Sequence, residues 1–515
     1  MGFFTFFTFF TLAEVLVMKR WLALGWLLAL LPLIASARQI PVKTIPVATG
    51  DQFMIFPSVN MSMGGVSIAL DDPLYDPFVN PAKGINIQGV RFASAPSYYG
   101  ISMRDDFLDD ASSARTLPVG MLLRQGTLFG GAVMAWQELS KQSTNFCCFA
   151  LGDPRISIRR EQSSTSHNNI YAFAMAGAQL PDTDLSVGAS AFVAGLNGLE
   201  GVRLLYSDGD RVEQDGHMSA FRLGLFHQWD NGGSSELTVL HHRFEMEHQM
   251  DRVVWDPETE VWRIEQRIEN DETLGWAVHA GIQQPLDNGW RFGARLVGDW
   301  KRHPKIPNYD LMQIPRDPGN TSAYNIGLGL SRTLGPTTVG IDLIYEPIWS
   351  HTWADALEDT PIAGDEENGI VRAGEMTVEN FFRFDNSILR LGVRQAGDRF
   401  DFGLGLNFHN YRYTLDQENF VEAFKRELKE DWSEWTFTLG LGYNFTGFQL
   451  RYLSLLTLGT GRPGVEWDAR AFAEDQSFAN AAALGDFVVA PNGPLSLQDA
   501  RVWTHQVTLL IPINE

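Results

Sequence analysis

Stretches of about ten residues, in which apolar side chains alternate with polar ones or glycine, recur from residue 86 to the C-terminus. In residues 290–300 the apolar series begins at Trp290 and ends at Trp300, with charged residues between its members. Because side chains of a strand point alternately to opposite faces, such a stretch has one apolar and one polar face. Aromatic residues at both ends of the apolar face are typical of strands that cross a bilayer between two interfacial girdles. The pattern predicts an all-β fold, a transmembrane antiparallel β-barrel.

Connections between these stretches alternate in length. Short ones carry turn residues, as in Gln125-Gly126 and Leu334-Gly335-Pro336, whereas the intervening ones are long and polar. This is the layout of bacterial outer-membrane barrels, in which an even strand number places both chain ends in the periplasm. A soluble β-sandwich or propeller would also alternate, but it has no reason to alternate its connection lengths. We expect about 14–16 strands, from sixteen candidates at 86–97, 115–124, 127–138, 168–179, 185–195, 217–229, 235–246, 273–284, 290–300, 322–333, 337–347, 386–395, 400–412, 434–444, 448–455 and 501–513.

One apolar run long enough to cross a membrane stands near the N-terminus. Basic residues ending at Arg20 precede the run Trp21 to Ile34, and Ala35-Ser36-Ala37 follows it, which is the order of a secretory signal peptide. We expect residues 1–37 to be this signal, with 1–17 as an extension upstream of a start at Met18; the alternative is an uncleaved anchor. A hydrophobic content of 44% and a mean hydropathy of −0.12 are too polar for a helical membrane protein of this length.

Charge and cysteine usage narrow the functional classes. A net charge of −22 argues against nucleic acid as a partner, since nucleic acid needs a basic face. The only two cysteines, Cys147 and Cys148, are adjacent, so their redox state is left open and neither a disulfide scaffold nor a cysteine metal finger is expected. We expect no metal and no cofactor.

The alternation also assigns side chains to the lumen. The strand at 400–412 places Phe400 and Phe402 opposite Asp401 and Gly403, so charges and glycines share the inner face. Glycine lets another chain segment approach a strand closely, which indicates that something packs inside the barrel. The candidate lumen charges are Arg291, Arg295, Asp299, Arg390, Arg394 and Asp401.

A motif stands between the signal and the first strand. Residues 61–83 read MSMGGVSIALDDPLYDPFVNPAK. The order of a glycine-rich stretch, an acidic pair and an Asn-Pro-Ala just before the first strand resembles the FadL/PorV group of outer-membrane proteins. The matching positions are Gly64, Gly65, Asp71, Asp72, Asn80, Pro81 and Ala82.

This resemblance implies that residues 38–85 fold into the lumen as a plug and that residues 86–515 form the barrel. We expect Asp71 and Asp72 to pair with lumen arginines, since a charge removed from water needs a partner. The function implied is uptake of hydrophobic small molecules, such as long-chain fatty acids or hydrocarbons, across the outer membrane of a Gram-negative bacterium. The alternatives are a PorV-like shuttle of type IX secretion and an open porin-like barrel. Implied partners are the hydrophobic ligand, outer-membrane lipid and lipopolysaccharide, and the barrel assembly machinery; the oligomeric state is open.

No nucleophile, metal or phosphate motif supports an enzyme. Because some outer-membrane barrels are hydrolases, His409 and His505 are the residues to inspect. Residues 345–353 carry Ile348, Trp349 and Trp353, which either lie at the membrane interface or line an apolar mouth for a ligand.

Overall fold

The computed structural model describes residues 48–103, 111–147, 159–200, 211–256, 261–303, 319–356, 358–363, 369–463 and 497–514. The predicted signal at 1–37 lies outside the described residues, as does Cys148, and Cys147 ends strand β4. Among the described residues, no helix is both long enough and apolar enough to cross a membrane.

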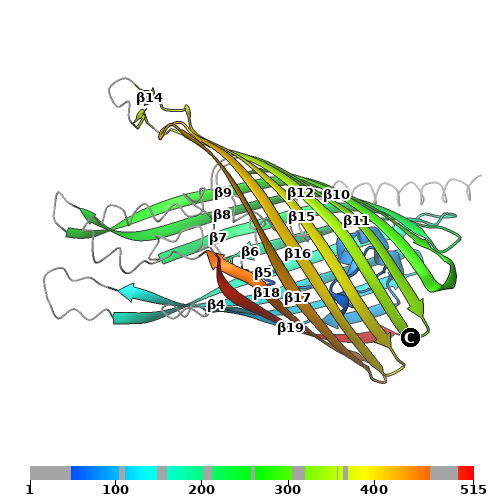
Figure 1. The fold of residues 1–515 in the computed structure, drawn as a ribbon. Helices are drawn as coiled ribbons and strands as arrows, with labels where there is room; N and C mark the ends of the chain where they lie inside the picture. The colour runs from blue at the N-terminus through cyan, green and yellow to red at the C-terminus, as the bar shows by residue number, and fades with distance from the viewer. Residues whose placement is uncertain are drawn as a thin grey trace, which may run out of the picture. The chain divides into compact units, whose positions relative to one another are not determined.

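Strands dominate the chain, and all pairs of the main sheet are antiparallel (Figure 1). The strands are β1 (Val90–Ser94), β2 (Ser97–Met103), β3 (Ala111–Gln125), β4 (Leu128–Cys147), β5 (Arg159–Gln179), β6 (Leu185–Leu196), β7 (Arg211–Gln228), β8 (Ser234–Asp256), β9 (Val261–Pro285), β10 (Trp290–His303), β11 (Gly319–Leu334), β12 (Thr337–Asp355), β15 (Met376–Ala396), β16 (Phe400–Asn419), β17 (Phe424–Asn444), β18 (Gln449–Pro463) and β19 (Leu497–Asn514), with a separate small pair β13 (Thr360–Pro361) and β14 (Ile370–Val371).

The main sheet closes on itself as a sixteen-strand barrel. Its seventeen strands occupy sixteen positions because β1 and β2 share one, each pairing with both β3 and β19. Ser94 pairs with Val119 and Ser97 with Thr116, so the register continues across the break between them. Pro96 lies in this break and has no N–H to give to the ladder. The predicted barrel and its strand number are confirmed.

The predicted short turns are tight, and Gly126 and Gly335 adopt positive φ values of 62° and 56° in two of them. At the other end the strands run further than the sequence suggested. The long loops expected at 247–272 and 413–433 are largely continuous strand, because β8, β9, β16 and β17 extend through them. These extensions were not predicted because a hairpin with water on both faces has no apolar face, so apolar and polar residues do not alternate along its strands.

The outer face of the barrel is apolar. Leu296 is 53% exposed while its neighbour Val297 is 6% exposed, so the two point to opposite sides of the wall as predicted. Outward aromatics gather at two levels: Trp300, Tyr324 and Trp349 form a chain with ring centroids 6.0 and 5.7 Å apart, and Tyr443, Phe445 and Phe448 form another near the short turns. Two aromatic levels bounding exposed aliphatic residues are the signature of a wall that meets lipid.

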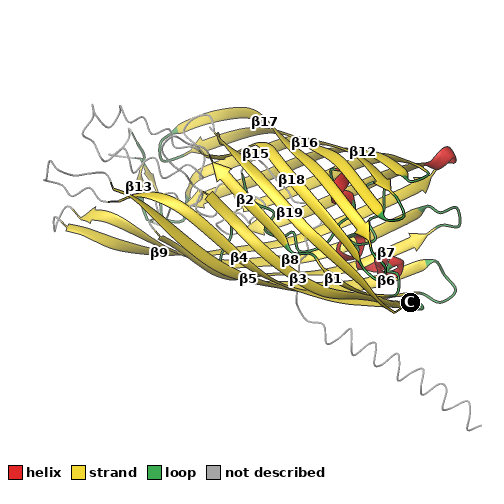
Figure 2. Cartoon of the chain, turned by 90° about the horizontal axis from the view of Figure 1, so that it is seen from below, coloured by secondary structure: helices red, strands yellow, loops and turns green. Residues whose placement is uncertain are grey.

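Residues 48–89, which precede β1, lie within the barrel. They form three short helices, η1 (Asn60–Met63), α2 (Asp76–Val79) and η2 (Pro81–Asn86). Figures 1 and 2 show the N-terminal helices surrounded by strands, close to the end of the barrel at which the C-terminus lies. We refer to residues 48–89 as the inner segment.

Candidate channel interior

A belt of glycines on the lumen face receives the inner segment. A Cβ on Gly188 would lie 2.6 Å from the carbonyl carbon of Pro81, and one on Gly293 would lie 2.6 Å from that of Ile68. Real Cβ atoms do not approach so closely, so these positions must be glycine for the segment to dock. The prediction that lumen glycines admit a packed segment therefore matches the contacts. The belt comprises Gly188, Gly224, Gly293, Gly329, Gly340, Gly392, Gly403, Gly405 and Gly440.

The glycine pair of the motif meets the wall directly. Gly64 follows η1 with φ 70°, and its amide N–H donates to Thr438 Oγ1 at 2.9 Å. An added Cβ on Gly64 would lie 2.6 Å from the carbonyl oxygen of Leu406. Gly65 has φ 77°, and its carbonyl accepts from Arg390 at 3.3 Å. Both positions have the left-handed backbone that favours glycine, and at Gly64 the close approach of the wall excludes a Cβ as well.

Asn80 joins the inner segment to the wall at the start of η2. Its Oδ1 accepts the N–H of Ala82 at 3.1 Å, which is the interaction of a helix N-cap, and Pro81 occupies the first helical position. Its Nδ2 donates to the carbonyl of Leu225 at 3.1 Å and to Glu236 Oε2 at 3.3 Å. The Asn-Pro-Ala sequence therefore begins a helix and attaches it to β7 and β8.

The two acidic residues have different partners. Asp71 forms an ion pair of 2.7 Å with Arg291, as expected. Within the described residues, the carboxylate of Asp72 has its partners in the inner segment itself. Its buried carboxylate accepts from Ser58 Oγ at 2.6 Å and from the N–H groups of Val59, Asn60, Leu74 and Tyr75. The expectation that Asp72 pairs with an arginine is wrong. Five local hydrogen-bond donors already offset the free-energy cost of burying its carboxylate.

A buried ion cluster that the sequence analysis did not identify lies beside Asn80. Lys83 Nζ is 3.2 Å from both Asp76 Oδ2 and Glu236 Oε2. Burial raises the pKa of Asp76 to about 7, although Lys83 acts in the opposite direction. Burial lowers the pKa of Lys83, but the charges of Asp76 and Glu236 outweigh it and raise the pKa above its usual range. The cluster holds a lysine charged inside the barrel and ties η2 to β8.

The remaining candidate lumen charges divide into two groups. Arg295 donates to the Ser67 carbonyl at 3.4 Å, and with Arg291 and Arg390 it contacts the inner segment. Arg394 instead forms a bidentate ion pair with Asp401 at 2.8 and 2.5 Å, and Arg451 joins it at 2.7 Å. Asp299 lies 3.5 Å from Lys301. The pairs at Asp299 and Asp401 therefore belong to the wall itself.

Residues 345–353 all belong to β12, which continues beyond the predicted strand end at residue 347 to Asp355. Ile348 is fully buried and faces inward, whereas Trp349 points outward and contacts Tyr324 with ring centroids 5.7 Å apart. Trp353 shares the outward side and lies 5.2 Å from His351. Strand alternation therefore places both tryptophans on the outer side of the wall and only Ile348 in the interior.

The two candidate catalytic histidines lie on opposite faces of the wall. His409 is buried in the lumen and stacks on Tyr411 at 3.8 Å. His505 is on the outer side and its Nδ1 is 2.8 Å from the Tyr452 hydroxyl.

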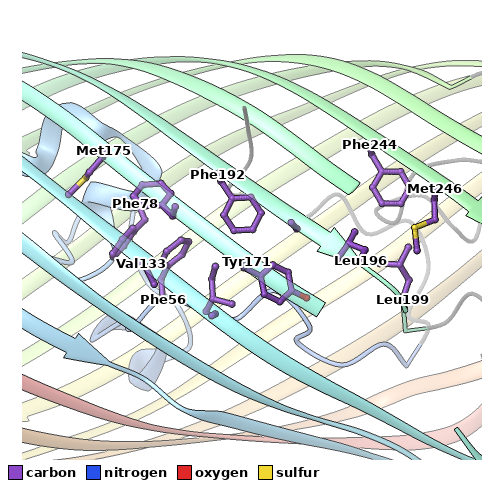
Figure 3. Close-up of a cluster of buried hydrophobic side chains, with 14 of the residues drawn as sticks. Phe56, Phe78, Val133, Tyr171, Met175, Phe192, Leu196, Leu199, Phe244 and Met246 are labelled. Atoms are coloured by element: carbon purple, nitrogen blue, oxygen red, sulfur yellow. The ribbon is translucent and has the colours of Figure 1, made fainter. Parts of the chain in front are cut away.

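One side of the lumen is apolar, which the sequence analysis did not predict. The cluster spans β3 to β8 and the inner segment, and Figure 3 shows it from Met175, near the short-turn end of β5, to Met246 of β8. Met250, further along β8, also belongs to it. Strands β5 and β6 carry apolar side chains on both faces, so the period of two could not mark this inner face. The inner apolar cluster consists of Ile55, Phe56, Phe78, Ile87, Leu122, Val133, Ala135, Tyr171, Phe173, Met175, Phe192, Ala194, Leu196, Leu199, Phe244, Met246 and Met250.

The inner segment fills the end of this cluster that lies nearer the short turns. Phe56 and Phe78 stack with ring centroids 4.0 Å apart, and both meet Phe173 edge-on at 5.3 and 5.1 Å. Arg222 of β7 is 1% exposed and donates to the Phe78 carbonyl. Within the described part of the chain, its Nε and Nη2 have no hydrogen-bond partner. A cation with donors to spare therefore lies beside the stacked phenylalanines.

A closed antiparallel wall with an apolar outer face defines an outer-membrane β-barrel whose lumen holds an N-terminal segment. Among solved structures, the chain is similar to a FadL homologue of Pseudomonas aeruginosa, with 11% identity over 91% of this chain and all of that chain and a TM-score of 0.42. It is also similar to the toluene transporter TodX of P. putida, with 11% identity over 92% of this chain and 98% of that chain and a TM-score of 0.35. For the toluene transporter TbuX of Ralstonia pickettii, the identity is 12% over 91% of this chain and 98% of that chain, and the TM-score is 0.36. No protein-family model and no curated protein matches the chain.

Proposed function

We propose that this protein is an outer-membrane channel for the uptake of hydrophobic small molecules. The observation that carries the proposal is the inner apolar cluster, which continues along one side of the lumen and ends at Phe56 and Phe78 of the inner segment. A water-filled porin needs a polar lumen, whereas an apolar solute gains about 25 cal/mol per Å² of surface removed from water along such a path. The inner segment acts as the plug that closes the path at rest.

The position of Arg222 supports a finer proposal for the ligand. A guanidinium with unpaired donors, buried next to an apolar cluster, suits the carboxylate of a long-chain fatty acid better than a plain hydrocarbon. The alkyl chain would lie along Phe173 and Phe192 while the carboxylate meets Arg222. This arrangement favours amphiphiles with one anionic end.

Uptake into proteoliposomes tests the channel function. The purified protein should admit hexadecanoate or hexadecane faster than liposomes without protein. Phe244→Asn, which makes the apolar side polar, should reduce uptake at least about tenfold, since a buried amide without partners costs more than about 1.4 kcal/mol. Thr321→Asn on the lumen face of β11 is the matched control and should leave uptake unchanged. No uptake by the intact protein, or equal effects of both changes, would reject the proposal.

Planar bilayers separate this function from an open porin. The plug predicts little steady conductance for the intact protein. A wide conductance that does not depend on the inner segment would instead indicate a porin. A secretion shuttle of the PorV kind would bind a protein substrate and show no uptake of either ligand.

A further inference from the structure

The chain leaves the barrel wall after β6 and turns inward. β6 pairs with β5 only at residues 170–179 of β5, although β5 begins at Arg159. Asn169 stands where the ladder stops, and its Oδ1 accepts the N–H groups of Asn197 and Gly198 at 2.8 and 3.2 Å. The side chain thus replaces the missing ladder partner and directs residues 197–200 into the lumen.

Residues 197–200 bind the inner segment through Gln52. The Nε2 of Gln52 donates to the Gly198 carbonyl at 2.9 Å, and its Oε1 accepts the N–H of Glu200 at 3.0 Å. The backbone carbonyl of Gln52 accepts from Gln137 at 2.7 Å, and Gln137 Oε1 in turn accepts from Asn169 at 3.0 Å. Every side chain of this amide network is buried, so each of its hydrogen bonds is shielded from water.

Residues 196–200 also cover the inner apolar cluster. Leu196 and Leu199 belong to that cluster and pack toward Phe244 and Met246 (Figure 3). Leu199 is 2% exposed. Its carbonyl accepts from Lys141 at 3.1 Å, and its N–H donates to Gln214 at 3.0 Å. The turn therefore lies over the cluster at the side away from Phe56 and Phe78.

We infer that residues 197–200 are a gate over the apolar path and that Gln52 latches this gate to the plug. The inference rests on the proposed function, since the gate regulates the same path. One glutamine bonds the gate with its side chain while its backbone belongs to the plug, so undocking of the plug removes two of the hydrogen bonds that hold the gate closed. Movement of the plug therefore weakens the closure at both ends of the path together.

Thiol labelling of Leu199→Cys tests the latch without any ligand. The variant is made with Cys147→Ser and Cys148→Ser, reconstituted, and exposed to a membrane-impermeant maleimide. Labelling should be slow with Gln52 intact and should rise at least about tenfold with Gln52→Ala, since both side-chain hydrogen bonds to the gate are lost. Gln52→Asn, which keeps the amide but shortens the side chain, should produce a similar rise.

Gln506→Ala is the matched control. Gln506 is buried and donates to the carbonyl of Phe56 at 3.4 Å, so it contacts the plug but not the gate. Its removal should leave labelling within about twofold of the starting rate, because it breaks no hydrogen bond to residues 197–200 and the bond that is lost is a long one. The latch hypothesis is overturned if neither Gln52 variant changes the labelling rate while both barrels still change their mobility in SDS gels on heating. Raised labelling together with absent uptake would support the latch and reject the channel.

Discussion

Asp71 of the inner segment and Arg291 of β10 form an ion pair of 2.7 Å between residues 220 positions apart in the sequence. Both side chains are partly exposed, and exposed pairs contribute only about 0–1 kcal/mol. Asp72, one residue on, is buried and satisfies five donors of the segment itself. Asp72, which has no cationic partner among the described residues, is therefore the more important of the two for the shape of the inner segment.

Asp72→Ala should loosen the plug more than Asp71→Ala. Losing the carboxylate leaves buried N–H groups unsatisfied at about 1–3 kcal/mol each, whereas losing Asp71 breaks one exposed pair. Bilayer recordings should give a clear leak for Asp72→Ala and little for Asp71→Ala, with Asp72→Asn in between because it keeps one acceptor oxygen. The reverse order would show that charge pairing with the wall holds the plug.

Deleting residues 48–86 should open a pore while the barrel still assembles. All strands and turns of the wall follow this segment, so the wall loses no ladder partner. The deletion variant should keep the mobility difference between boiled and unboiled samples in SDS gels and gain a steady conductance. An assembled variant with the conductance of the intact protein would contradict the plug.

Gly293→Ala should displace the plug without harming the wall. The added Cβ would meet the backbone of Ile68, which has no flexible end to move aside. Gly195→Ala is the matched control, because a Cβ there meets nothing within 4 Å. Trypsin should cut the inner segment faster in the first variant only. Equal resistance to cleavage in both would mean that the glycine belt does not govern docking.

Leu296→Arg should lower the yield of assembled barrel. A cation on the lipid face near the midplane costs about 2–4 kcal/mol, and the cost falls to about 0–1 kcal/mol near the interface. Leu286 is a suitable comparison, being 50% exposed like Leu296 but located at the short turn before β10. Leu286→Arg should assemble normally. If both variants assemble equally well, the outer face is not in lipid.

Arg222→Met should separate the two ligand classes. Methionine preserves much of the buried volume but has no donors, so hexadecanoate uptake should fall about tenfold, in line with a lost charge-assisted hydrogen bond of about 1.5–3 kcal/mol. Hexadecane uptake should stay the same. A parallel loss for both ligands would assign Arg222 to the Phe78 carbonyl and to plug docking rather than to ligand choice.

The sequence by itself determined the barrel, a strand number of about 14–16, and which side chains of a strand face outward. These follow from local rules: alternation assigned Leu296 outward and Val297 inward, and turn residues such as Gly126 marked the short connections. The inward glycines also indicated a packed segment, because a missing side chain on one strand face is visible in the sequence. Each of these features depends on residues close together in the chain.

Only the tertiary structure decided which partners meet inside. The sequence could not show that Asp71 and Asp72 have different kinds of partner. The donors to Asp72 come from the irregular fold of residues 58–75, which has no repeating pattern in the sequence. The partners of Gln52 lie 85 to 148 positions away, and the inner apolar cluster unites β3 to β8 with the inner segment. Such contacts are set by barrel closure, which brings opposite strands to one lumen, and the pattern along a single strand does not carry that information.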